Sequence, residues 1–154
     1  MSDWKRKPQE VPFESLLSEM VAAINKHIEQ YNLGPILSDS IMCVQTDSVK
    51  AKKGLFSRDE TVYTGAMITP RWLVWGTSGI KIETTVLSAQ LIDILVQDYA
   101  QTEFVKMIPD SGINVTGKFT DVSEKSTVFI GLGEGATGDK FKETVIKAVQ
   151  DVKK

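Results

Sequence analysis

Closely spaced strand candidates constrain this chain more than any other feature of its sequence. Residues 61–85 read TVYTGAMITPRWLVWGTSGIKIETT, in which runs of β-branched and aromatic residues are separated by Thr69-Pro70 and by a turn sequence at 76–79. Parallel neighbours need a connection of about a dozen residues or more, and these runs lie too close together for that. The stretch therefore predicts consecutive antiparallel strands.

The same pattern continues on both sides of this stretch. Between residues 36 and 132 we expect about seven strands, arranged as an antiparallel meander or a strongly bent barrel. Residues 87–104 fit either a helix or a strand, and their β-branched residues favour a strand. The strand candidates are 41–46, 49–56, 62–68, 72–75, 80–86, 113–119 and 127–132.

Two helices flank the strand-rich region. Apolar residues between Phe13 and Tyr31 recur at helical spacing, which predicts an amphipathic helix within 11–33 that ends before Gly34-Pro35. Residues 139–153 form a second apolar stripe, with Asp139 suited to its N-cap. We expect an α+β chain with a flexible N-terminus at 1–10, an added N-terminal helix and one domain at 36–154.

Composition excludes several classes of protein. The 154 residues are 42% hydrophobic and 25% charged, which is typical of one soluble domain. The net charge of -2 gives no overall electrostatic attraction for nucleic acid. We expect no secretory signal or membrane-spanning helix, because no apolar stretch of sufficient length follows the polar N-terminus. These features, and a single cysteine within an apolar run (Cys43), predict a cytoplasmic protein.

Few residues are suited to catalysis or metal binding. His27 is the only histidine and Cys43 the only cysteine, so neither a structural zinc site nor a catalytic triad is expected. Gly133-x-Gly135-x-x-Gly138 has the spacing of a dinucleotide-binding motif, but no strand with an acidic residue follows it. We interpret it as a glycine linker, with an incidental anion site at the next helix as the alternative. We therefore expect no enzymatic activity, no cofactor and no metal.

The order of these elements resembles the pleckstrin-homology-like superfold, including its GRAM-type and bacterial members. The residues that carry the resemblance are 65–75 (GAMITPRWLVW) and 126–131 (STVFIG), the latter leading through a glycine loop into the last helix. It covers roughly residues 36–153. The resemblance implies a β-barrel with a C-terminal capping helix.

In members of this superfold that bind phosphoinositides, basic residues of the first hairpin hold the head group. The resemblance carries that ligand-binding role to four residues, Lys50, Lys52, Lys53 and Arg58. A second basic cluster lies at residues 4–7 (WKRK). Acidic residues close to the four hairpin residues, including Asp59, would repel phosphate, so a solvated hairpin is the alternative.

Trp72 and Trp75 lie three positions apart on one predicted strand, so they should point to opposite faces. One should face the core, and the other should pack under the first helix or contact a neighbouring chain. With His27, at the edge of the helical stripe, they form the candidate interaction surface.

The sequence thus favours a non-enzymatic interaction module that binds a protein or its own copies through strand edges and the first helix. Peripheral binding to anionic lipid head groups is the first alternative. A small-molecule binder or enzyme at the barrel mouth is the second.

Overall fold

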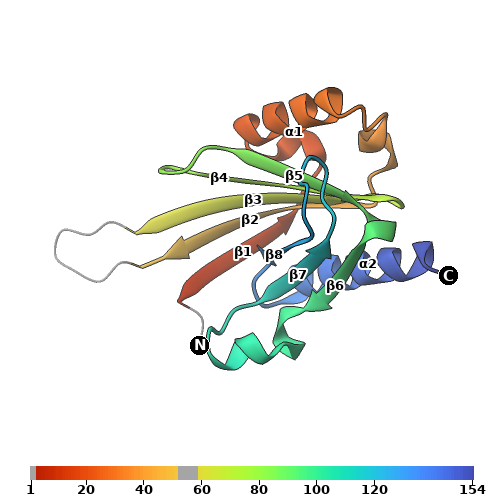
Figure 1. The fold of residues 1–154 in the computed structure, drawn as a ribbon. Helices are drawn as coiled ribbons and strands as arrows, with labels where there is room; N and C mark the ends of the chain where they lie inside the picture. The colour runs from red at the N-terminus through yellow and green to blue at the C-terminus, as the bar shows by residue number, and fades with distance from the viewer. Residues whose placement is uncertain (1–2, 52–58) are drawn as a thin grey trace.

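The computed structural model describes residues 3–51 and 59–154, which form two antiparallel sheets and two α-helices (Figure 1). Sheet A has five strands in the order β1-β2-β3-β4-β5, and every neighbouring pair is antiparallel. Its strands are β1 (Trp4–Glu10), β2 (Met42–Lys50), β3 (Glu60–Ile68), β4 (Trp72–Gly79) and β5 (Thr85–Gln90). The meander predicted from the close spacing is therefore present.

Sheet B has three strands in the order β6-β7-β8, namely β6 (Ile94–Asp98), β7 (Gly112–Gly117) and β8 (Ser126–Gly131). The long helix α2 (Ala136–Val152) follows β8 and packs beside β6 (Figure 1). Short 3-10 turns occupy several connections: η1 (Phe13–Ser15), η2 (Ile36–Asp39), η3 (Leu91–Asp93), η4 (Tyr99–Gln101) and η5 (Glu103–Lys106).

Side chains alternate between the two faces of sheet A, so its apolar residues contribute to two separate hydrophobic clusters. One face packs toward sheet B and α2, where Trp75, Ile130 and Phe141 are among the buried residues of the inter-sheet cluster. The opposite face packs under helix α1 (Ser18–Gln30), which contributes Met20 and Ile24 to the outer cluster. Sheet A is therefore buried on both faces over much of its area.

The two tryptophans of β4 lie on opposite faces, as their spacing predicts. Trp75 is 3% exposed in the inter-sheet cluster, and its ring meets that of Phe119 edge to face at 5.3 Å. Trp72 is partly buried and packs against the outer cluster, on the side that α1 covers. Gly76 lies on that side too, where an added Cβ would come 2.4 Å from the Met20 sulfur.

Several elements differ from the sequence-based prediction. Residues 4–10, expected to belong to a flexible N-terminus, form β1 and pair along the whole of β2. The chain has eight strands in the described ranges, and the two sheets do not close into a barrel. The ambiguous 87–104 stretch holds the end of β5, then η3, β6, η4 and the start of η5, so the preference for a strand there is confirmed only in part.

The boundaries of both predicted helices also shift. The region 11–33 contains η1 and α1, which are separated by Leu16 and Leu17, whose backbone angles are not helical. Helix α2 starts three residues before the predicted cap, with Gly135 as its N-cap in place of Asp139. The residues predicted as a strand at 80–86 belong to a connection until β5 begins at Thr85.

Candidate functional site

Strand β1 places the basic cluster of residues 4–7 beside Lys50, the one residue of the other basic cluster that the structure describes. Its register with β2 places Trp4 opposite Lys50, whose ammonium nitrogen lies 5.8 Å from the centre of the indole ring. Lys5 and Lys7 alternate with Trp4 and Arg6, and both lysines are exposed. Of the four residues assigned to the head group, Lys50 ends β2, whereas Lys52, Lys53 and Arg58 lie outside the described residues.

Arg6 joins the free edge of sheet A to sheet B. Its Nε and Nη2 donate to the two carboxylate oxygens of Asp110, at 2.8 and 2.7 Å, and Nη1 donates to Ser48 Oγ at 2.8 Å. The side chains of Arg6 and Asp110 are each 11% exposed. The pair is therefore bidentate and largely removed from water, the geometry in which an arginine–carboxylate contact is strongest.

Two aromatic rings flank the same guanidinium group. Its carbon lies 5.0 Å from the ring centre of Trp4 and 5.5 Å from that of Phe129 on β8. Distances below about 6 Å allow cation–π attraction on top of the ion pair. Arg6 thus contacts β1, β2, β8 and the segment before β7, although β1 and β8 share no backbone ladder.

Glycines at the end of β8 leave room for this arginine. A Cβ on Gly131 would lie 2.5 Å from Cζ and Nη1 of Arg6, and one on Gly133 would lie 2.7 Å from the Arg6 carbonyl oxygen. Gly133 and Gly135 also have positive φ angles of 74° and 121°, which favour glycine. Close packing and turn geometry together account for much of the Gly133-x-Gly135-x-x-Gly138 motif.

A surface cleft of ≈ 350 Å³ opens beside this contact. Strand β1 forms one wall, and the residues before β7 and after β8 form the other. Its lining residues are Trp4, Lys5, Arg6, Lys7, Asp110, Ser111, Gly133 and Glu134. The mixture of both charges with one indole ring makes a polar cleft that is open to solvent.

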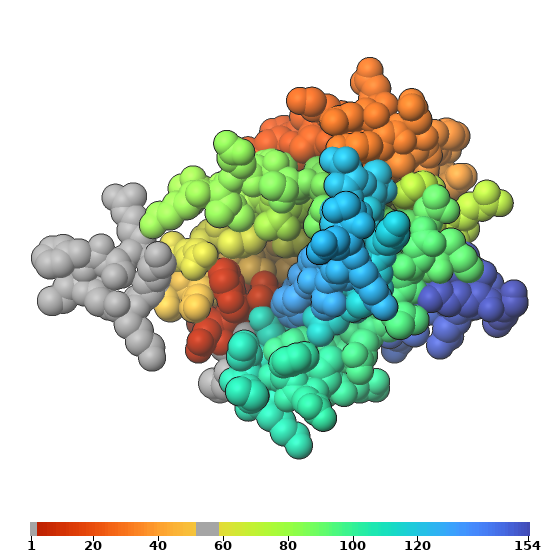
Figure 2. Space-filling view, viewed as in Figure 1, coloured from red at the N-terminus to blue at the C-terminus, as the bar shows by residue number. Residues whose placement is uncertain are grey.

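An exposed apolar ridge lies in the segment that connects β6 to β7, the last two residues of which, Asp110 and Ser111, line the cleft. The ridge consists of Phe104, Met107 and Ile108, which are 61%, 82% and 67% exposed. Figure 2 shows the residues around 100–110, in teal, beside β1, in red. Three large exposed apolar side chains within five residues are unusual for a surface with no partner.

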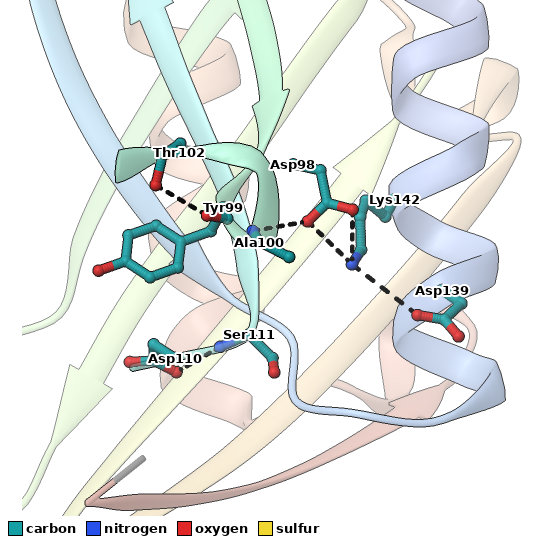
Figure 3. A network of polar contacts seen from close by, with 8 residues as sticks. All are labelled: Asp98, Tyr99, Ala100, Thr102, Asp110, Ser111, Asp139 and Lys142. Atoms are coloured by element: carbon teal, nitrogen blue, oxygen red, sulfur yellow. Dashed lines mark hydrogen bonds and ion pairs between the residues drawn. The ribbon is translucent and has the colours of Figure 1, made fainter. Parts of the chain in front are cut away.

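Polar contacts hold the segment that carries the ridge (Figure 3). Asp98 at the end of β6 accepts hydrogen bonds from the Ala100 N–H at 3.0 Å and from Lys142 of α2 at 3.2 Å. The Tyr99 hydroxyl donates to the Ile108 carbonyl oxygen at 2.6 Å, and the Ser111 N–H donates to Asp110. These hydrogen bonds anchor the β6–β7 connection that carries the ridge.

The other candidate surface residues are less accessible. His27 is 8% exposed and hydrogen-bonds Ser88 Oγ at 2.7 Å, and Trp75 is buried in the inter-sheet cluster. Trp72 lies partly exposed beside a second cleft, of ≈ 420 Å³, between the β3–β4 turn and residues 33–39. These three residues do not form one surface.

Cys43 is a free, buried residue of the outer cluster, and burial raises the pKa of its thiol to about 12. A thiol with such a pKa is protonated at neutral pH and is a poor nucleophile. Within residues 3–51 and 59–154, no three His, Cys, Asp or Glu side chains are grouped as metal ligands.

Sequence reasoning missed β1 and therefore the whole arginine contact. The partners Arg6 and Asp110 are 104 residues apart in the chain, so no local pattern links them. One signal was present, since Trp4, Arg6 and Pro8 alternate with three exposed polar residues. That period of two is typical of a strand even where charged residues replace apolar ones.

In the described part of the chain, no helix has the length and apolarity needed to cross a bilayer. No family model matches this sequence, and no curated protein or solved structure shows significant similarity to it.

Proposed function

We propose that this protein is a non-enzymatic, pleckstrin-homology-like interaction module that docks on anionic membrane surfaces. The observation that carries the proposal is the juxtaposition of the apolar ridge with the basic strand β1 and Lys50. Stable attachment to a bilayer usually takes two signals, apolar insertion and attraction to anionic head groups. The ridge supplies the first signal and the lysines supply the second.

The order of the elements supports the pleckstrin-homology-like part of the proposal. A four-strand meander (β2–β5), a three-strand meander (β6–β8) and a closing helix (α2) follow one another, with β1 and α1 as additions. An experimental structure with α2 outside the inter-sheet cluster would contradict this assignment.

The non-enzymatic part rests on the burial of the two residues best suited to nucleophilic or general-base chemistry. His27 lies on the buried face of α1, and Cys43 lies in the outer cluster with a raised pKa. If the wild-type protein turns over a substrate and a His27→Gln variant does not, that result would contradict the non-enzymatic proposal.

Self-assembly through the edge of β1 has less support. The Val11 N–H donates to the Cys43 carbonyl oxygen, and the alternation of the ladder then turns the backbone of Arg6 and Pro8 toward the free edge. Proline has no N–H to donate there, and Gly133 lies against the Arg6 carbonyl oxygen. Both features block an added strand.

Co-sedimentation with vesicles tests the membrane proposal. We expect the protein to pellet with phosphatidylserine-containing vesicles at low salt, and to remain in solution with phosphatidylcholine alone or at 0.5 M salt, because salt screens such attraction. A Lys5→Glu/Lys7→Glu variant should lose at least tenfold in apparent affinity. Its matched control is Lys125→Glu/Lys147→Glu, which changes charge equally on exposed residues away from β1.

A second variant tests the ridge. Phe104→Ser/Met107→Ser should weaken binding while leaving the salt dependence in place, because the lysines remain. Binding that is equal for wild type and both variants, or absent for wild type, would contradict the proposal.

A protein partner is the second candidate. Ile92 and Leu95 are 53% and 63% exposed on the other side of sheet B, where η3 meets β6. If the protein does not bind vesicles, a pull-down would test this candidate. Loss of partner capture in an Ile92→Ser/Leu95→Ser variant would support it, and unchanged capture would count against it.

A further inference from the structure

A chain of hydroxyl and imidazole groups connects α1 to β5 and to the loop between β7 and β8. His27 Nε2 lies 2.7 Å from Ser88 Oγ, and Ser88 Oγ donates to Thr120 Oγ1 at 2.8 Å. The Thr120 N–H donates to the Ser88 carbonyl oxygen, also at 2.8 Å. Three elements that are distant in the sequence therefore meet at one buried serine.

A second contact fastens the same helix to the same loop. The Tyr31 hydroxyl, just after α1, donates to Asp121 Oδ2 at 2.8 Å. The Tyr31 ring lies 4.8 Å from the His27 ring, and Asp121 adopts a positive φ of 62°. Figure 1 shows the β7–β8 loop reaching up to α1 along the edge of β5.

The direction of these hydrogen bonds fixes the state of the imidazole. Because the Ser88 hydroxyl donates to Thr120, its oxygen accepts from His27, so the neutral ring carries its proton on Nε2. A second proton would have to enter at Nδ1, and it would place a positive charge on a side chain that is only 8% exposed.

Few groups around His27 would offset the positive charge of its protonated ring. Asp121 is the charged group that faces it from the β7–β8 loop, Tyr31 is the titratable group from the α1 side, and β5 presents the neutral Ser88 hydroxyl. Burial lowers the pKa of His27 below 6.5, and Asp121 opposes this effect without cancelling it.

We propose that the His27–Ser88–Thr120 chain is an acid-sensitive latch, in which protonation of His27 loosens α1 from β5 and from the β7–β8 loop. Loosening of α1 uncovers the outer cluster, including Met67 and Val74 of sheet A, on a face that the membrane proposal does not use. The latch is thus independent of that proposal.

The sign of the effect follows from linkage. The unfolded or undocked His27 has a pKa near 6.5 and the docked one a lower pKa, so neutral His27 favours the docked helix. The stabilisation is complete well above pH 6.5 and is lost as the pH falls toward the lowered pKa. Across that window, each unit of pH raises the opening equilibrium constant of α1 by up to tenfold, and below it the constant levels off.

Hydrogen exchange of the amides of α1 measures this opening. We expect exchange of residues 20–30, corrected for intrinsic rates, to accelerate between pH 7.5 and 5, whereas residues 141–149 of α2 provide the internal reference. Equal pH dependence of α1 and α2 would overturn the proposal.

Two variants separate the latch from general acid destabilisation. His27→Gln retains an N–H donor for Ser88 but does not titrate, so the acid-induced acceleration in α1 should disappear. Tyr31→Phe removes the contact with Asp121 and keeps the imidazole, so the acceleration should persist. Persistence in the glutamine variant would contradict the latch.

The wild-type protein offers a test that needs no variant. His27 is the only histidine, so its ring protons give one assignable NMR titration. We expect a midpoint below 6.5 with concerted shifts of Ser88 and Thr120 amides, and a midpoint at or above 6.5 would overturn the proposal.

Discussion

The two sheets meet at two corners that are built in different ways. At one corner the chain itself passes from β5 through Leu91–Asp93 into β6, and Leu91 and Ile94 are fully buried there. At the other corner β1 and β8 approach without a backbone ladder, and Arg6 of β1 contacts both Asp110, just before β7, and the Phe129 ring of β8. Covalent continuity secures the first corner, whereas side chains secure the second.

This difference also separates the chemistry of the two corners. The β1–β8 corner carries the buried ion pair, the polar cleft, the exposed lysines and, beside them, the apolar ridge. The β5–β6 corner displays two exposed apolar residues, Ile92 and Leu95. Side-chain contacts, and not a continuous stretch of chain, hold the β1–β8 corner. Charged groups can therefore occupy it, which suits this corner to contact a partner.

Removing the arginine should have the largest effect on stability. Arg6→Ala leaves Asp110 and Ser48 without their partner in a largely buried site, and we expect a loss of about 3 kcal/mol of unfolding free energy. Urea denaturation followed by circular dichroism measures the loss. A change below about 1 kcal/mol would show that the corner does not depend on this contact.

Crowding the same corner should cost less. Gly131→Ala places a methyl group within contact distance of the guanidinium, so Arg6 must shift, at a cost of about 1–3 kcal/mol. Thr127→Ala, an exposed position on the same strand, is the control; it loses only a hydroxyl contact with Thr116 and should change stability by less than about 1 kcal/mol. Equal effects of the two substitutions would argue against close packing at Gly131.

The anchor between β6 and α2 should contribute less again. Lys142→Ala removes an ion pair with Asp98 whose partners are 13% and 23% exposed, and we expect a loss of about 1 kcal/mol. Because Asp98 also caps Ala100, limited proteolysis should then cut faster within residues 99–108. Unchanged proteolysis would mean that the lysine does not brace the ridge.

An exposed ion pair at the end of β1 should contribute least. Lys140 and Glu10 lie 2.7 Å apart, but their side chains are 60% and 47% exposed. Lys140→Ala should therefore change the unfolding free energy by less than about 0.5 kcal/mol, even though the pair joins β1 to α2. A loss comparable to that of Arg6→Ala would contradict the role given to burial at this corner.

The strands whose buried faces are apolar were easier to predict than the assembled corner. Alternating or continuous apolar runs predicted strands near β3, β4, β7 and β8, because their buried faces are apolar. The opposite orientations of Trp72 and Trp75 followed from the period of two alone. Such features depend on residues that are neighbours in the chain.

The assembled corner depends on long-range pairing. Strand β1 has the sequence WKRKPQE, which is polar because its inner side chains make a charged and aromatic contact in place of an apolar one. Pairing with β2 extends the chain there, although local propensity favours no strand. Neither Asp110 nor the cleft beside it could be identified until this pairing was known.

Paramagnetic relaxation in the presence of anionic vesicles that carry a spin-labelled lipid tests the proposed contact surface most directly. If the β1–β8 corner docks on the membrane, the amides of residues 4–7 and 104–108 should broaden, whereas those of residues 91–95 at the other corner should not. Broadening confined to residues 91–95, or absent throughout the chain, would contradict the proposal.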